Sequence, residues 1–505
     1  MSRTKQFLYN SISTAMMQII TMVVGFIIPR VMLDVYGSEI NGLVSSIVQF
    51  ISYFNLVEAG ISGAAIYALY KPLADNDHKT INGIVSASKK FYIQSGYIFV
   101  SLTIGLAVFY PFYIKTNQLS PVYVGLMVLI LGVNGALEFF TLAKYRVLLS
   151  ADQKTYVISL SSILQIVVNT ILIVVLAHFK VNIVLLRFVA LFSIFSRSAI
   201  LMIYCKSKYK YLNYKETPNK QALNKRWDAL YLQVLGAVHT GTPVVLITLI
   251  LKDLKLVSVY TIFNMVIAGI SGVLSIFISG LSASFGDVIA RGELQTLQKT
   301  YQEFEHSYYN IITIVYSITF LTIMPFINIY TKGITDANYN IPLVGFLFVL
   351  NGLLFNIKTP QGMLVISAGM YKETKWQTTI QGAIAVIGGI LFAPFFGIAG
   401  ILMGSVLSNL YRDIDLMFFI PHHVTHLSVK KSALRILRIF ACIFFVWVPF
   451  FFIHITPQSY LNWALFAGGI GIYTIVVVLT LGLIFDRVEM KNVIRRFSSI
   501  VGAKK

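Results

Sequence analysis

The sequence predicts an all-α integral membrane protein, and three features of it support this fold class. Hydrophobic residues make up 57% of the 505 positions, and charged residues only 12%. The apolar residues occur in blocks of about 20 or more, which is the length that an α-helix needs to cross the bilayer core. Basic residues are concentrated in every second segment between these blocks, as the positive-inside rule describes. Membrane topology therefore explains the net charge of +20 better than nucleic-acid binding does.

Fourteen transmembrane helices are predicted in this way. We expect them at residues 12–33, 43–70, 92–114, 121–148, 157–178, 182–205, 230–252, 257–283, 308–330, 341–368, 376–396, 398–420, 433–455 and 461–485. Alternate loops then carry 30 basic residues on one side of the membrane and five on the other, which predicts that both termini are cytoplasmic. When the basic residues near helix ends are counted with the adjacent loops, five remain embedded in the predicted helices: Arg30, Arg187, Arg197, Lys358 and Arg412.

The sequence also contains a weak internal repeat at an offset of about 217 residues. Asn134, Gly135, Ser150 and Ala151 match Asn351, Gly352, Ser367 and Ala368, Gly60 and Ser62 match Gly280 and Ser282, and Arg197 matches Arg412. Each copy contains six helices, so both copies enter the membrane from the same side. Two parallel bundles around a midplane site are a common transporter plan, in which the bundles rock to give alternating access.

The repeat divides the chain into four predicted parts. They are an N-terminal six-helix bundle at 1–205, a basic cytoplasmic linker at 206–228, a C-terminal six-helix bundle at 229–428, and helices 13 and 14 with a basic tail at 429–505. The two bundles are expected to be pseudo-symmetric, and the last two helices are an addition to them.

Three segments carry a resemblance to a known family. They are "FIIPRVMLDVYGSEINGLVSSI" from Phe26, "FNLVEAGISGAAIYALYKPLADND" from Phe54 and "IKTPQGMLVISAGMYKETK" from Ile357. The chain resembles the bacterial flippases of lipid-linked polysaccharide repeat units, the O-antigen and capsule exporters. That family belongs to the multidrug/oligosaccharidyl-lipid/polysaccharide exporter superfamily. The motifs that carry the resemblance lie mainly in the first 80 residues and in the tenth predicted helix, at residues 341–368.

The resemblance implies a function, a location and partners. The substrate would be an undecaprenyl-diphosphate-linked oligosaccharide, exported from the cytoplasmic to the outer leaflet of the bacterial inner membrane for surface polysaccharide assembly. A proton or sodium gradient would drive it, no cofactor is implied, and a polysaccharide polymerase and glycosyltransferases are candidate partners. An anionic, hydrated headgroup independently calls for fixed positive charge, which Arg supplies in bidentate form.

Lys358 is the first candidate substrate-binding residue. It lies about ten residues from the cytoplasmic end of its helix, or roughly 15 Å, which is near the midplane. Pro360 removes a backbone donor two residues later and can bend the helix. Either Lys358 faces a hydrated cavity, with Arg197 and Arg412 as basic companions, or it pairs structurally with Glu58 or Glu138.

The other embedded charges leave similar alternatives open. Glu58 and Glu138 are candidate ion-coupling carboxylates, or else neutral acids or partners of an arginine. Arg412 can pair with Asp415 three residues later. Snorkelling toward the outer surface accounts for Arg30, which is also a candidate substrate contact, and for Arg187.

Two rival functions share some of these features. A multidrug extruder would have the same fold, but its cationic substrates favour a cavity rich in carboxylates and aromatics. A membrane-embedded polymerase or ligase is disfavoured, because the predicted external loops are too short to carry catalytic side chains, so we expect no enzymatic activity. The "HHVTH" segment from His422 lacks nearby acidic or cysteine partners and predicts no metal site.

Overall fold

The computed structural model describes residues 3–58, 60–214, 216–219, 226–278, 281–452, 456–487 and 489–490. Gly280 of the predicted repeat, part of the predicted linker and the basic tail from residue 491 lie outside these ranges. The described residues are almost entirely helical and include no β-strand, which confirms the predicted fold class.

Eleven segments of the described chain are long and apolar enough to cross a membrane. The first of them, Lys5–Asp75, covers two of the predicted helices. Two further predicted helices correspond to α9 (Arg226–Leu246) and to α16 (Ile398–Ile420), which carries three charged residues. Each of the fourteen predicted helices therefore has a helical counterpart, and the protein is a multi-pass membrane protein.

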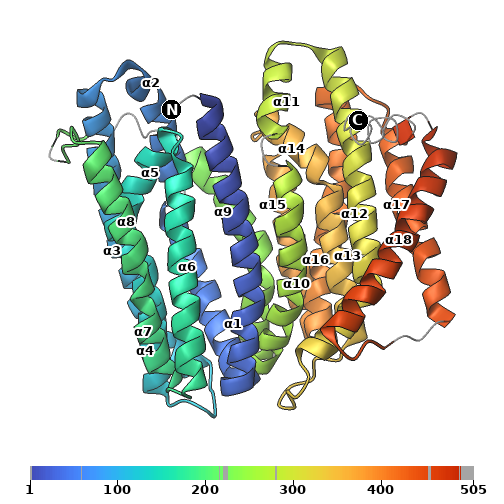
Figure 1. Ribbon diagram of the computed structural model, residues 1–505, viewed down its shortest axis with the longest axis horizontal. Coiled ribbons are helices and arrows are strands. Elements are labelled where there is room, and N and C mark those ends of the chain that lie inside the picture. The colour runs from blue at the N-terminus through green and yellow to red at the C-terminus, as the bar shows by residue number, and fades with distance from the viewer. Residues whose placement is uncertain are drawn as a thin grey trace, which may run out of the picture. The chain divides into compact units, whose positions relative to one another are not determined.

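The chain divides into two compact units, Met1–Thr261 and Ile262–Lys505, coloured blue to green and green to red in Figure 1. We refer to them as unit 1 and unit 2. The boundaries predicted from the repeat, at residues 205, 228 and 428, remain predictions.

Unit 1 begins with α1 (Arg3–Phe54), which is bent at Gly37. Gly37 has φ 78°, a left-handed value that favours glycine, and it separates the first two predicted helices. The next helices are α2 (Ile61–Asp75), α3 (His78–Tyr113), α4 (Pro121–Leu137), α5 (Ala143–Ala151), α6 (Thr155–His178), α7 (Ile183–Leu191), α8 (Ser193–Lys208), α9 and the first part of α10 (Leu254–Ile278).

The helices of unit 1 begin at recognisable sequence signals. Asp77 caps α3 by accepting a hydrogen bond from the Thr80 N–H at 3.0 Å, and this bond together with that from the Thr80 hydroxyl lowers the pKa of the Asp77 carboxyl. Asn182 caps α7 in the same way, and Pro121 occupies the first turn of α4. The α1 helix packs on α6, and α4 packs on α3 and α7, around a continuous apolar core.

The described part of unit 2 contains the rest of α10 and eight further helices. They are α11 (Leu281–Ala290), α12 (Leu294–Tyr330), α13 (Pro342–Ile357), α14 (Thr359–Ser367), α15 (Lys375–Phe396), α16, α17 (Val429–Phe452) and α18 (Tyr460–Phe485). The α16 helix packs on α13 and α15, and α12 packs on α17 and α18.

Glycines bring α15 and α16 into backbone contact. A Cβ added at Gly388 would lie 2.9 Å from the Cα of Gly404, and one at Gly400 would lie 2.2 Å from the carbonyl oxygen of Phe392. Gly400 and Gly404 lie four residues apart on α16, and this pair of small residues allows close helix packing.

A buried charge network joins the last two helices to α12. Arg435 of α17 donates to Glu305 of α12 at 2.8 Å and to Asp486, directly after α18, at 2.9 Å. The Nδ1 atom of His306 lies 3.0 Å from the same Asp486 carboxylate. Burial alone would raise the pKa of Asp486, but the hydrogen bond with His306 and the charge of Arg435 outweigh it and hold this pKa below its usual value.

Candidate functional site

Four ionisable side chains of unit 1 form one charge cluster. Arg146 of α5 donates to Glu138 at 2.5 Å and to Glu58 at 2.7 Å, so a single guanidinium binds both predicted coupling carboxylates. Arg197 of α8 lies 3.7 Å from the same oxygen of Glu138. The two acids are thus matched by two arginines, as buried charges in membranes generally are.

Interruptions in the helices place these groups. Glu58 ends the short 3₁₀ turn Asn55–Glu58, and Gly60, with φ 84°, precedes α2. Glu138 begins a π-helical turn, Glu138–Leu142, that joins α4 to α5. Such turns are frequent at functional sites, because they redirect side chains within an otherwise regular helix.

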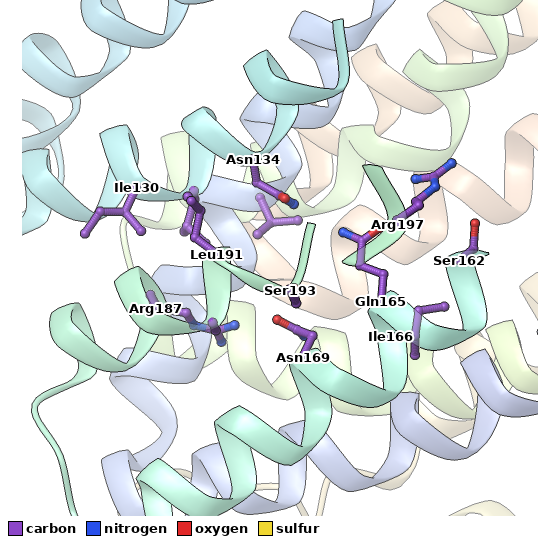
Figure 2. Close-up of a pocket in the computed structure, with 13 residues that line it drawn as sticks. Ile130, Asn134, Ser162, Gln165, Ile166, Asn169, Arg187, Leu191, Ser193 and Arg197 are labelled. Carbon is purple, nitrogen blue, oxygen red and sulfur yellow. The ribbon is translucent and has the colours of Figure 1, made fainter. Parts of the chain in front are cut away.

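A cavity of about 330 Å³ lies next to this cluster, within unit 1 (Figure 2). Its polar lining comes from four helices: Asn134 of α4, Ser162, Gln165 and Asn169 of α6, Arg187 of α7, and Ser193 and Arg197 of α8. The three α6 residues are spaced three and four apart, which places them on one face of that helix. Figure 2 shows Arg187 and Asn169 pointing toward one another.

The lining of this cavity carries positive charge. Arg187 and Arg197 belong to it, and none of its described lining residues is acidic. Among the described residues, the Nε atom of each arginine is buried without a hydrogen-bond partner, and the Nη2 atom of Arg187 lies 3.6 Å from the Met32 sulfur. Donors left unsatisfied in this way can bind an anion, which Arg does in bidentate form.

Lys358 occupies the joint between α13 and α14 in unit 2. Its ammonium donates to the side-chain oxygen of Asn409 on α16 and lies 5.1 Å from the Phe355 ring. Asn409 in turn donates to Asn351 at 2.8 Å. The hydrogen-bond acceptor of Lys358 is therefore a neutral amide. Glu58 and Glu138, its two predicted structural partners, are both bound by Arg146 in unit 1.

The α16 helix carries three charged residues, and two of them, Arg412 and Asp413, interact electrostatically with Lys358. Arg412 pairs with Asp415 at 2.5 Å, as their spacing predicts. Asp413 is only 8% exposed and interacts electrostatically with Lys358. Arg412 and Lys358 thus belong to one polar region of unit 2, whereas Arg197 belongs to unit 1.

Arg30 forms an ion pair with Asp34, four residues later on α1, at 3.0 Å. Its side chain is 31% exposed, and the pair follows the helix surface. This arrangement fits the structural alternative for Arg30, and its predicted substrate contact remains a prediction.

Sequence reasoning missed two important residues. Arg146 lies near a predicted helix end and belongs to the basic residues that the charge count assigns to a cytoplasmic loop, although it binds two acids inside unit 1. The sequence gives no reason to single out Asp413 beside Arg412 and Asp415. The repeat gave a usable signal, because its matched positions Asn134 and Asn351 each lie in the polar region of their own unit.

Comparison with known proteins shows a shared fold. No family model matches the chain, and no curated protein matches it. A structure described as "Lipid II flippase MurJ, inward closed conformation" superposes with a TM-score of 0.69 and 13% sequence identity, covering 94% of this chain and 99% of that one. An inward-facing multidrug resistance MATE family transporter of the MOP superfamily gives a TM-score of 0.66 and 14% identity, covering 83% and 99%.

A third similar structure is described by the polarity of its own binding pocket. It is a MOP superfamily transporter from Pyrococcus furiosus, described as having a binding pocket of reverse polarity, with a TM-score of 0.60, 12% identity and coverage of 85% and 96%. At these identities the likeness establishes the fold. Flippases and drug transporters both have it, so the substrate has to be argued from this chain's own residues.

Proposed function

We propose that this protein is a flippase that moves undecaprenyl-diphosphate-linked oligosaccharide repeat units from the cytoplasmic to the outer leaflet by alternating access. The observation that carries the proposal is the cavity of unit 1, with two arginines and no acidic side chain in its described lining. A diphosphate is a divalent or more highly charged anion, and Arg matches its oxygens in geometry as well as in charge.

The neutral residues of the cavity suit the sugar. Gln165, Asn169 and Asn134 each offer both a donor and an acceptor, and Ser162 and Ser193 add hydroxyl groups. Hydroxyl-rich ligands need such groups, because each hydroxyl stripped of water must regain a partner. A volume of about 330 Å³ accommodates part of a headgroup rather than a whole repeat unit.

We propose four basic residues as substrate contacts. They are Lys358 and Arg412 in unit 2, and Arg197 and Arg30 in unit 1. The orientation with both termini in the cytoplasm of a bacterial cell belongs to the same proposal, because the substrate is made on that side.

Glu58 and Glu138 are proposed as the residues that bind the coupling proton or sodium ion. Both carboxylates are part-buried, and both are held by Arg146. An ion that binds there must compete with the guanidinium, so its binding would loosen the contacts that join α5 to the turns before α2 and α5. Such a change is a direct way to connect an ion gradient to helix movement.

The alternative function is the export of cationic drugs. A cavity for cations would be expected to present carboxylates. In unit 1 the two nearby acids are instead neutralised by arginines, which favours an anionic substrate.

The test uses the full chain in proteoliposomes. One set carries a short polyprenyl-diphosphate disaccharide, whose flipping is followed by periodate oxidation of the sugar from outside, and another set carries ethidium. We expect flipping of the lipid and no transport of ethidium. The double variant Arg187→Gln/Arg197→Gln should lower lipid flipping at least tenfold.

Arg291→Gln is the matched control, because Arg291 is exposed and pairs only along its own helix end, with Asp287. It should flip the lipid like the wild type. Ethidium transport without lipid flipping would replace the flippase proposal by the drug-export alternative.

A further inference from the structure

Asp413 of α16 is a buried acid whose carboxylate lacks hydrogen-bond partners among the described residues. It is 8% exposed, and neither of its carboxylate oxygens has a hydrogen-bond partner in the described structure. Asp415, two residues later, differs because it accepts a hydrogen bond from Arg412. An ionised carboxylate without partners is costly in a low-dielectric interior, so Asp413 depends on the charges that face it.

Few charges face Asp413. Lys358, at the joint between α13 and α14, donates to Asn409, which lies one helical turn before Asp413 on the same face of α16. Its ammonium supplies the positive charge that interacts with Asp413. Tyr309 of α12 is a second titratable group within electrostatic range. On the neighbouring α15 helix the amide of Gln381 donates to Asn409, and Arg412 is paired with Asp415.

Lys358 is itself incompletely held. Its ammonium has three donors, and the side-chain oxygen of Asn409 is the acceptor that the structure shows for it. Lys358 is also half-buried rather than sealed. A phosphate that reached this ammonium would offer more acceptors and more charge than Asn409 and Asp413 together.

We propose that Lys358 and Asp413 form a proton-exchange pair, in which Asp413 takes up a proton from water when a phosphate of an anionic lipid headgroup draws Lys358 away. This inference rests on the proposed flippase function, because it requires an anionic substrate. The charge balances: the pair is neutral before binding, and afterwards the protonated Asp413 is neutral while Lys358 is neutralised by the phosphate.

This role is separate from that of Glu58 and Glu138. Those acids keep an arginine partner within unit 1, whereas Asp413 would lose its counter-charge as a direct result of substrate binding. Headgroup binding and proton uptake are therefore linked in unit 2, and by reciprocity a lower pH strengthens headgroup binding.

Proton uptake can be measured with the purified full chain. Farnesyl diphosphate is titrated by calorimetry at pH 7.5 in buffers of different ionisation enthalpy, which gives the number of protons taken up on binding. The wild type should take up close to one proton more than Asp413→Asn, and the comparison removes the ligand's own titration. Asp413→Asn should also bind several-fold more tightly, because Lys358 no longer has to leave a carboxylate.

Asp287→Asn is the matched control, since Asp287 is exposed and pairs with Arg291 outside this region. It should take up protons like the wild type. If Asp413→Asn fails to fold, Lys358→Met serves in its place and should bind weakly with no linked proton. Equal proton uptake in the wild type and Asp413→Asn overturns the exchange pair but leaves the flippase proposal standing. Failure of the wild type to bind farnesyl diphosphate overturns both.

Discussion

Replacing Arg146 should destabilise the protein through two acids at once. Its Nη2 lies 2.7 Å from Glu58 and its Nη1 2.5 Å from Glu138. At an effective dielectric constant of about 20, each contact is worth roughly 6 kcal/mol of Coulomb attraction. Desolvation cancels most of this. The three side chains are 22 to 33% exposed, which lowers the remainder further by screening.

We therefore expect Arg146→Gln to cost about 2 to 3 kcal/mol, because it leaves two carboxylates without their main partner. For a unit of this size the loss corresponds to a decrease in Tm of roughly 4 to 12 °C. The measurement is thermal unfolding of the purified protein in detergent, followed by a fluorescent thiol reagent that reacts with the buried Cys205.

The triple variant Arg146→Gln/Glu58→Gln/Glu138→Gln separates charge from packing. It removes the two acids together with Arg146 and leaves only Arg197 of the cluster, so it should be more stable than Arg146→Gln alone. Lys154→Gln is a control, because Lys154 pairs with Asp152 outside the cluster. A change in Tm below 1 °C for Arg146→Gln, or a triple variant less stable than the single one, would refute this account of the cluster.

Three further outcomes are expected. At equal membrane abundance, Lys358→Arg should keep partial export of the lipid-linked sugar, whereas Lys358→Gln and Lys358→Glu should block export and trap the substrate inside. Normal export by Lys358→Glu would show that positive charge at this position is not required. After Cys205 and Cys442 are replaced by Ala, single cysteines are placed at positions 4, 216 and 503, of which the last is outside the described residues. They should resist a membrane-impermeant thiol reagent in intact cells. Labelling without lysis would reverse the predicted topology. Asp486→Asn should lower stability by about 2 to 3 kcal/mol, because it leaves Arg435 short of a partner. Because the pKa of Asp486 is lowered in the folded state, its contribution to stability is fully present above the pKa of the unfolded state and is lost only as the pH falls through the lower folded pKa. The difference in Tm between Asp486→Asn and the wild type should therefore be as large at pH 5 as at pH 8. Disappearance of that difference by pH 5 would contradict the network.

The helices could be predicted from the sequence because the bilayer imposes one simple requirement, a long apolar block. Within those blocks the sequence is less informative. The apolar block around Lys358 predicts one bent helix, and the structure has two, α13 and α14, with Lys358 at their joint. Pro360 in the first turn of α14 was the local signal for this joint.

The partners of charged residues could not be predicted, because they depend on how distant segments pack. Arg146 is 88 residues from Glu58 in sequence, and a π-helical turn shifts the register of the helix between Glu138 and Arg146. No local pattern encodes such a contact. Arg197 could be identified from its embedded position alone, whereas Gln165 and Asn169 required recognition that neutral amides share one face of α6.

The glycine contact between α15 and α16 has a mechanical consequence. Where two helix backbones touch without intervening side chains, there is little compressible material between them, so the pair should move as one stiff body. Asn409 and Asp413 are carried on that body. Lys358 stands on the other side, at the joint of α13 and α14, where the regular backbone ladder is interrupted and bending is easiest. A small change in the angle of that joint would therefore move the Lys358 ammonium relative to Asn409 and Asp413, which stay fixed on the stiff helix pair.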